Sequence, residues 1–373
     1  MDLLQRFFGS DEALAGRLRT LHRRMFDTLP SVDRVACALY DAQEDLLKTF
    51  VHSTRVGTPI SRYEYKLSES RSLSEIAATG QPRVLNDLHL ALTADRVHTT
   101  WVLEQGYRSS YTVPIHDAGT LIGMVFYDSV EKDAFPPVVQ RDLLLYTSLI
   151  NMAVANELAA VRAITTSTKV ARDLADLRDF ETGAHLDRMS RYARIIARTL
   201  APKYDLTDEY IEHVFLFAPL HDVGKIGIPD AILLKHGALT LEERDQMRSH
   251  VTKGMEVVQR MLGDLGLQHF PDSSVLGNIV RAHHEFLDGS GYPLGLKGAS
   301  VPLEARIVTA ADIFDALTSP RPYKGAWTRD EALDEMRKMV RDGKLDHDCV
   351  EALATCEAEV SHIFGRYQDV IAA

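Results

Sequence analysis

The stretch His221-Asp222-Val223-Gly224-Lys225 (HDVGK) determines how the rest of the sequence is interpreted. Neighbouring residues on a helix point about 100° apart, so His221 and Asp222 could bind two metal ions, or one ion and its bridging solvent. Lys225 follows Asp222 by three residues and is expected on the same face of that helix. By itself, the stretch fits a metal site and a solvated surface pair equally well.

The composition limits the classes of function. The 373 residues are 45% hydrophobic and 25% charged, which is ordinary for a globular protein of two to three domains. A formal net charge of -11 argues against non-specific nucleic-acid binding. Cys37, Cys349 and Cys356 are too few and too scattered for a disulfide framework or a thiolate zinc site. Because the sequence has no signal-peptide core and no run of about 18 apolar residues, we predict a cytoplasmic protein that does not bind nucleic acid or a membrane.

The first part of the chain mixes helical and strand periodicity. Apolar residues recur at helical spacing within residues 3–29 and predict an amphipathic helix. Alternating patterns then predict four strands over residues 32–40, 46–52, 109–116 and 121–129. A short helix is predicted between the second and third of them, over residues 72–78. Such a mixture is typical of a small α+β domain.

Short motifs in this part carry a family resemblance. They are Thr79-Gly80-Gln81-Pro82, the hairpin from Val113-Pro114-Ile115 to Leu121-Ile122-Gly123-Met124, and Phe135 at the start of the last helix. These motifs resemble a GAF domain over about residues 15–155, so we expect a sensor or dimerisation domain at residues 1–155. The resemblance implies a small-molecule ligand or a dimer interface. Cys37 lies in a predicted strand and is expected to be a buried apolar thiol rather than a chromophore attachment point.

A long helix is predicted to connect the two parts of the chain over residues 136–178. Apolar residues recur at three- and four-residue steps from Leu143 to Ile164, and the pattern continues to Leu177. We expect this helix also to pair two chains into a homodimer. An amphipathic helix packed only on its own domain fits the pattern equally well.

Residues 172–373 are predicted to form an all-α domain. Strand alternation is almost absent there, and Thr240 with Glu243 forms a capping-box signature. The predicted helices cover residues 187–200, 208–220, 241–262, 274–286, 302–317 and 329–339.

Histidines and carboxylates concentrate in this all-α part. Each one alone is more often a satisfied core or surface group, but their combination in one helical domain indicates a metal site. Imidazole and carboxylate donors without thiolates suit iron, manganese or another divalent ion of similar hardness. The candidate ligands are Glu181, His185, His221, Asp222, His250, His283, His284 and Asp312.

Longer motifs in the same part carry a second resemblance. They are HDVGKIGIPDAIL from His221, HHEFLDGSGYPLGLKG from His283, PLEARIV from Pro302 and ADIFDALTSPRPYK from Ala311. These motifs resemble the HD-GYP branch of the HD-domain phosphohydrolases over about residues 172–345. The resemblance implies a metal-dependent phosphodiesterase that hydrolyses cyclic di-GMP to pGpG with a metal-bridging hydroxide. The eight candidates then look like metal ligands, with Asp222 bridging and Glu181 holding a third ion that would carry hydrolysis on to GMP.

The same resemblance implies roles for further side chains. Asp222 and Lys225 look like the catalytic residues. The residues expected to bind substrate phosphate or guanine are Lys225, Tyr292, Arg321 and Lys324. Those expected to orient imidazoles or Lys225 are Asp179, Glu285 and Asp315. The loop that contains Gly291-Tyr292-Pro293 could also present a surface to a protein partner.

Two other functions stay open at the level of sequence. Another cyclic dinucleotide, such as cyclic GMP-AMP, would fit the same residues. A different class is an adaptor that binds metal and nucleotide with little turnover. The intact ligand set and Lys225 favour an enzyme over that adaptor.

Overall fold

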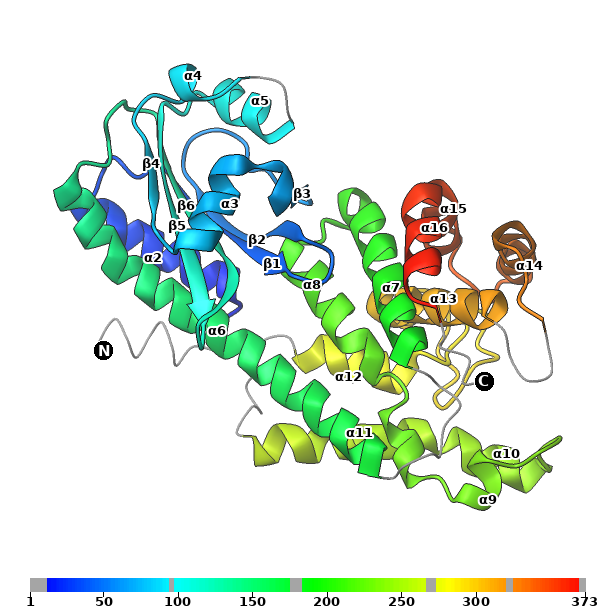
Figure 1. The fold of residues 1–373 in the computed structure, drawn as a ribbon. Helices are drawn as coiled ribbons and strands as arrows, with labels where there is room; N and C mark the ends of the chain where they lie inside the picture. The colour runs from blue at the N-terminus through cyan, green and yellow to red at the C-terminus, as the bar shows by residue number, and fades with distance from the viewer. Residues whose placement is uncertain (1–11, 94–96, 175–182, 266–272, 320–324, 369–373) are drawn as a thin grey trace. The chain divides into compact units, whose positions relative to one another are not determined.

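The structure is a computed structural model that describes residues 12–93, 97–174, 183–265, 273–319 and 325–368. The chain divides into two compact units, Met1–Ala159 and Ala160–Ala373, and each is described by itself (Figure 1). Five residues named above fall outside the described ranges, namely Leu177, Asp179, Glu181, Arg321 and Lys324.

The N-terminal unit contains a six-stranded antiparallel sheet with the strand order β3-β2-β1-β6-β5-β4. Its strands are β1 (Arg34–Asp41), β2 (Leu46–Thr54), β3 (Glu64–Lys66), β4 (Arg83–Leu85), β5 (Ser109–Asp117) and β6 (Thr120–Ser129). The four predicted strands are β1, β2, β5 and β6. The edge strands β3 and β4 have three residues each, which is too short for an alternating pattern to show.

Helices cover both faces of this sheet. On one face, α2 (Leu14–Thr28) and the first part of α6 (Pro137–Leu174) bury Leu21 and Leu143 against the strands (Figure 1). On the other face, α3 (Arg71–Thr79) packs through a smaller apolar cluster. Two short helices precede β5, α4 (Leu88–Ala91) and α5 (Val97–Glu104). The α+β class expected for this part is therefore correct.

Cys37 is sealed inside the sheet. Cys37 is 2% exposed, and burial raises the pKa of its thiol to about 12. A protonated, enclosed thiol is a poor nucleophile, so the prediction of a buried apolar cysteine is confirmed.

The helix α6 is long and apolar enough between Pro137 and Thr166 to cross a membrane, by length and composition alone. A core helix of a globular protein meets the same criterion. Leu143, Ile150 and Val154 pack against the sheet and are at most 2% exposed, and 33% of the apolar window is buried in all. On the rest of its surface, Leu145 and Met152 are 71% and 51% exposed.

In its described residues, the C-terminal unit contains helices and loops but no strands. Its α-helices are α7 (Gly183–Tyr204), α8 (Asp208–Phe217), α9 (Asp230–Leu233), α10 (Leu241–Arg248), α11 (His250–Asp264), α12 (Ser273–Ala282), α13 (Leu303–Thr318), α14 (Arg329–Arg341), α15 (His347–Thr355) and α16 (Glu357–Arg366). Three short 3-10 helices lie between them, η2 (Ala218–Leu220), η3 (Val223–Gly227) and η4 (Gly298–Ser300). The core is formed where α7, α8, α12 and α13 pack on one another around Tyr192, Phe217 and Phe314.

Some predicted boundaries in this unit were wrong. The single helix expected over 241–262 is two helices, α10 and α11, with Ser249 between them. The helix expected over 274–286 ends at Ala282. Periodicity is similar on both sides of such breaks, so the pattern alone could not locate them.

Candidate metal centre

The stretch HDVGK lies in tight turns rather than on an α-helix, contrary to the prediction. His221 and Asp222 connect η2 to η3, and Lys225 lies within η3. A Cβ atom on Gly224 would lie 1.8 Å from the carbonyl oxygen of His250 and 2.4 Å from the nitrogen of Gly254. Glycine at position 224 therefore lets η3 and α11 meet backbone to backbone, which brings Asp222 next to His250.

Seven of the eight predicted ligands gather in two groups. One group contains Asp222, His250, His283 and His284; the other contains His185, His221 and Asp312. Within each group, one possible ligand atom from every residue lies within 4.8 Å of the others. The eighth candidate, Glu181, lies outside the described residues.

Hydrogen bonds fix how the buried imidazoles present their nitrogens. In three histidines, Nδ1 faces a backbone carbonyl one turn earlier: His221 to Ala218 at 2.9 Å, His250 to Met247 at 2.8 Å and His283 to Ile279 at 3.1 Å. A carbonyl oxygen can only accept, so Nδ1 carries the proton in each ring. In a neutral imidazole, Nε2 then keeps its lone pair.

These Nε2 atoms converge on the carboxylate of Asp222. The nitrogens of His250 and His283 lie 3.0 and 3.4 Å from Oδ1, and that of His221 lies 3.2 Å from Oδ2. The lone pair of each imidazole then faces a lone pair of the carboxylate. Within the described residues, no hydrogen-bond partner is found for three of these buried atoms, Nε2 of His250, Nε2 of His283 and Oδ1 of Asp222. Acceptors held this way repel one another unless a cation lies among them, so the donor set fits a divalent metal ion.

Asp222 is held ionised in this setting. Burial alone would raise the pKa of its carboxyl, but the cation of Lys225 beside it helps to lower the pKa well below its usual value. The amine of Lys225 lies 2.8 Å from Oδ2, and its side chain is 21% exposed. Lys225 therefore reaches from the carboxylate to the edge of the site.

Asp315 anchors the second group, in agreement with its predicted role as an orienting residue. Its Oδ2 lies 2.7 Å from Nδ1 of His185, whose Nε2 lies 3.7 Å from Oδ1 of Asp312. Arg188 donates two hydrogen bonds to the same carboxylate, at 2.6 and 2.9 Å. Burial would raise the pKa of Asp315, but these bonds from His185 and Arg188 lower it. Sequence reasoning missed Arg188, although its position three residues after His185 places both on one face of α7.

Glu285 does not orient an imidazole or Lys225, so that prediction was wrong. It is 2% exposed, and its two oxygens accept backbone hydrogen bonds from Leu294 at 2.6 Å and Leu296 at 2.9 Å. A buried carboxylate that accepts two backbone N–H groups fixes the loop that follows His284.

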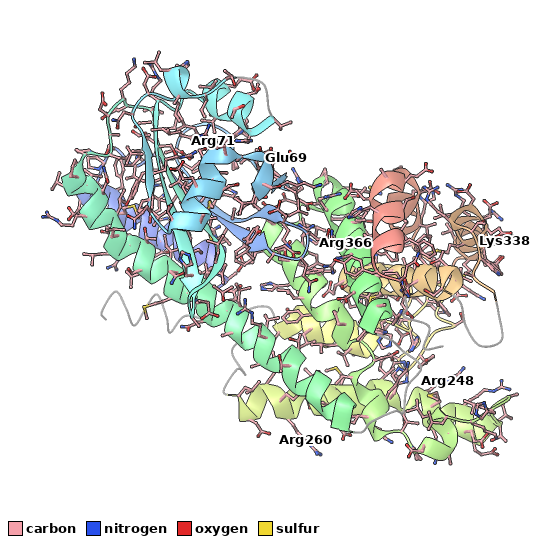
Figure 2. The ribbon with its side chains drawn as sticks, viewed as in Figure 1. Glu69, Arg71, Arg248, Arg260, Lys338 and Arg366 are labelled. Carbon is pink, nitrogen blue, oxygen red and sulfur yellow. The ribbon has the colours of Figure 1, made fainter. Side chains whose placement is uncertain are left out.

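That loop brings Tyr292 against the metal ligands. A Cβ on Gly291 would lie 2.4 Å from the backbone nitrogen of Phe286 and 2.5 Å from the carbonyl oxygen of His284, so only glycine fits there. The Tyr292 ring stacks on the His284 ring with centroids 4.6 Å apart, and its backbone nitrogen donates to the carbonyl of His284 at 3.1 Å. Arg248, labelled in Figure 2 at the end of α10, places its guanidinium carbon 5.0 Å from the centre of the Tyr292 ring. No sequence pattern pointed to Arg248.

The two units match two known families. Residues 169–349 match the HD domain, and residues 1–154 match the GAF domain. The chain joins a GAF domain to an HD domain. Both candidate ligand groups lie in the HD domain.

Curated relatives align with half of this chain or more. The cyclic di-GMP phosphodiesterase response regulator RpfG of Xanthomonas campestris is 43% identical over 232 residues, which are 62% of this chain and 57% of the relative. A cyclic di-GMP phosphodiesterase of Thermotoga maritima is 38% identical over 52% of this chain and 50% of its own length. A 3'3'-cGAMP-specific phosphodiesterase of Vibrio cholerae is 37% identical over 53% of this chain and 37% of its own length. The chain thus spans about half the length of the curated relatives it matches, or less.

Proposed function

We propose that this protein is a metal-dependent phosphodiesterase that hydrolyses cyclic di-GMP to pGpG in bacterial second-messenger signalling. The observation that carries the proposal is the set of buried imidazole nitrogens facing the carboxylate of Asp222, an arrangement that a bound divalent cation would stabilise. Relatives named as cyclic di-GMP phosphodiesterases support the choice of substrate.

The ligand groups suggest how ions would be held. Asp222, His250, His283 and His284 would hold one divalent ion, and His185, His221 and Asp312 would hold another. Asp222 has one oxygen toward each group and would bridge them. We propose iron, with manganese as the alternative, because the donors are imidazole and carboxylate. When bound, such ions supply a nucleophile at neutral pH and polarise a phosphoryl oxygen. Glu181 is proposed to hold a third ion, with GMP then the end product.

Side chains of the HD domain would bind the substrate and stabilise charge. Lys225 would turn from Asp222 toward a non-bridging phosphate oxygen and stabilise the negative charge that develops there. Tyr292 borders the site through its contact with His284 and would line the substrate pocket. Arg321 and Lys324 are proposed to contact phosphate or guanine.

The test combines metal analysis with chromatography of the products. The protein is purified without oxygen, its bound metals are quantified, and cyclic di-GMP turnover is followed beside a His221→Ala, Asp222→Ala variant. We expect wild-type protein to contain at least two ions and to release pGpG, and the variant to lose both properties. A wild-type protein that binds metal but forms no product would refute the enzyme and favour the low-turnover adaptor. A Glu181→Ala protein with unchanged metal content would remove Glu181 from the ligand set.

Hydrolysis of 3'3'-cGAMP is the second candidate, because a relative with that specificity aligns over 53% of this chain. Both dinucleotides have two phosphodiester groups and differ in one base. Parallel assays with each substrate decide between them by the ratio of kcat/KM.

Assembly and location are proposed from α6. Val138, Leu145 and Met152 are each at least half exposed and are spaced by seven residues, the repeat of a coiled-coil seam. We propose that this face pairs two chains in a cytoplasmic homodimer, while the opposite face of α6 packs on the sheet. The domain limits proposed are 1–155, 136–178 for the connecting helix and 172–373. A small-molecule ligand is proposed for the GAF domain, and a protein partner for the loop that carries Leu294, which is 59% exposed.

A further inference from the structure

Arg248 is a cation at the edge of the metal centre that none of the roles above uses. It is the last residue of α10, and the break at Ser249 separates it from the buried ligand His250. Its side chain is 56% exposed. In the described part of the chain its acidic contact is Asp245, at 4.0 Å, which is too long for a hydrogen bond. The guanidinium therefore keeps most of its capacity to donate.

The Tyr292 ring connects this guanidinium to the site. The guanidinium carbon lies 5.0 Å from the ring centre, and the same ring stacks on His284 at 4.6 Å. A cation over an aromatic face is held in place at modest cost in side-chain entropy. One side chain thus separates a positioned guanidinium from a candidate metal ligand.

Two cations at the site suit a substrate with two anions. Lys225 lies beside Asp222, where the reacting phosphodiester would bind, whereas Arg248 lies beyond Tyr292. A guanidinium donates two parallel hydrogen bonds to a phosphate, which a lysine amine cannot do. We propose that Arg248 binds the second, non-reacting phosphodiester of a cyclic dinucleotide and so determines specificity for cyclic over simple diesters. This inference rests on the proposed function and names one more residue of that site.

The proposal also changes the expected role of Tyr292. Its ring is engaged by His284 and by Arg248. Tyr292 would then act as a positioning residue for Arg248, and the substrate's second phosphate would bind beside it.

The test compares Arg248→Ala and Arg248→Lys with Arg260→Ala. Arg260 is the matched control, because it is an arginine of α11 whose side chain is 81% exposed and whose acidic contact, Glu256, is also at 4.0 Å (Figure 2). The substrates are cyclic di-GMP and bis(p-nitrophenyl) phosphate, which has a single diester. A slowly hydrolysed phosphorothioate analogue of cyclic di-GMP gives a dissociation constant by calorimetry, and metal content is measured for each variant.

Loss of a charge-assisted pair should weaken cyclic di-GMP binding roughly 10- to 100-fold in Arg248→Ala. The weakening should appear in KM and in the dissociation constant of the analogue, while kcat/KM for the single diester and the metal content stay at wild-type values. Arg248→Lys should bind cyclic di-GMP more tightly than Arg248→Ala but less tightly than the wild type. Arg260→Ala should bind it with wild-type affinity. Equal losses on both substrates, a loss of bound metal, or unchanged binding of the analogue would each overturn the proposal. If wild-type protein hydrolyses the single diester but neither binds nor hydrolyses the dinucleotide, the proposed function itself fails.

Discussion

Replacing Gly224 by alanine should separate the two backbone segments that bring Asp222 to His250. The added methyl carbon would lie 1.8 Å from the carbonyl oxygen of His250 and 2.4 Å from the nitrogen of Gly254. Both are backbone atoms and cannot rotate away as a flexible side chain could. Overpacking of a core typically costs about 1–3 kcal/mol, and this contact belongs at the upper end or above it.

The consequence can be measured as stability and as metal binding. A loss of about 3 kcal/mol lowers the unfolding temperature of a domain of this size by roughly 6–12 °C. Because η3 must move from α11, the 3.0 Å contact between Asp222 and His250 should open, and metal affinity should fall. Thermal unfolding is measured in the presence of chelator, and bound metal is measured separately after dialysis against limiting metal.

Gly277→Ala is the matched control in α12. A Cβ at position 277 meets only the end of Met255, at 4.0 Å, so the methyl group fits. Alanine in a helix interior is favoured over glycine by about 0.5–1 kcal/mol, so this variant should be slightly more stable. If Gly224→Ala unfolds at the wild-type temperature and keeps its metal, the argument from close backbone approach is refuted.

Three further outcomes are expected. Asp315→Asn should weaken metal binding roughly 10- to 100-fold, because His185 and Arg188 both lose the carboxylate that they contact. Metal titration of this variant beside the control variant Asp348→Asn checks the expectation, and equal affinities in the two variants would contradict it. A thiol reagent at about pH 8 should label Cys356 in the folded protein but not Cys37 or Cys349. Burial raises the pKa of the Cys37 thiol to about 12 and that of the Cys349 thiol well above its usual value. Mass spectrometry that finds either buried thiol labelled before unfolding would contradict this prediction. Leu145→Glu should convert a dimer to a monomer in sedimentation experiments, whereas Leu90→Glu, at a residue that is 87% exposed on α4, should not; a dimeric Leu145→Glu protein would remove α6 from the interface.

Local patterns in the sequence were sufficient for several parts of this protein. Helical spacing identified α7, α8, α12, α13 and α14 because a buried stripe recurs every three to four residues. The residue types of the metal centre were also readable, since imidazoles and carboxylates have little reason to gather in an apolar helical domain. Cys37 could be placed in a core because its neighbours alternate as in a strand.

Only the tertiary structure decided how these residues work together. The division of seven ligands into two groups depends on contacts among η3, α7, α11, α12 and α13, which lie far apart in the sequence. Which nitrogen of each histidine faces the site depends on a hydrogen bond from Nδ1 to a carbonyl, and that depends on side-chain rotamers. Glu285 is the opposite case, because a carboxylate beside two ligands looked like part of the site and instead holds a loop.

The stretch HDVGK shows both sides of this division. Its residue types alone identified a histidine, a carboxylate and a cation in a metal-binding pattern, and they could not choose between that site and a surface pair. The close approach of Gly224 to α11 made the difference, because it buries Asp222 among imidazoles whose lone pairs point at it. Periodicity along a chain reports which face of an element is buried, but it has no information on which distant backbone will touch that face.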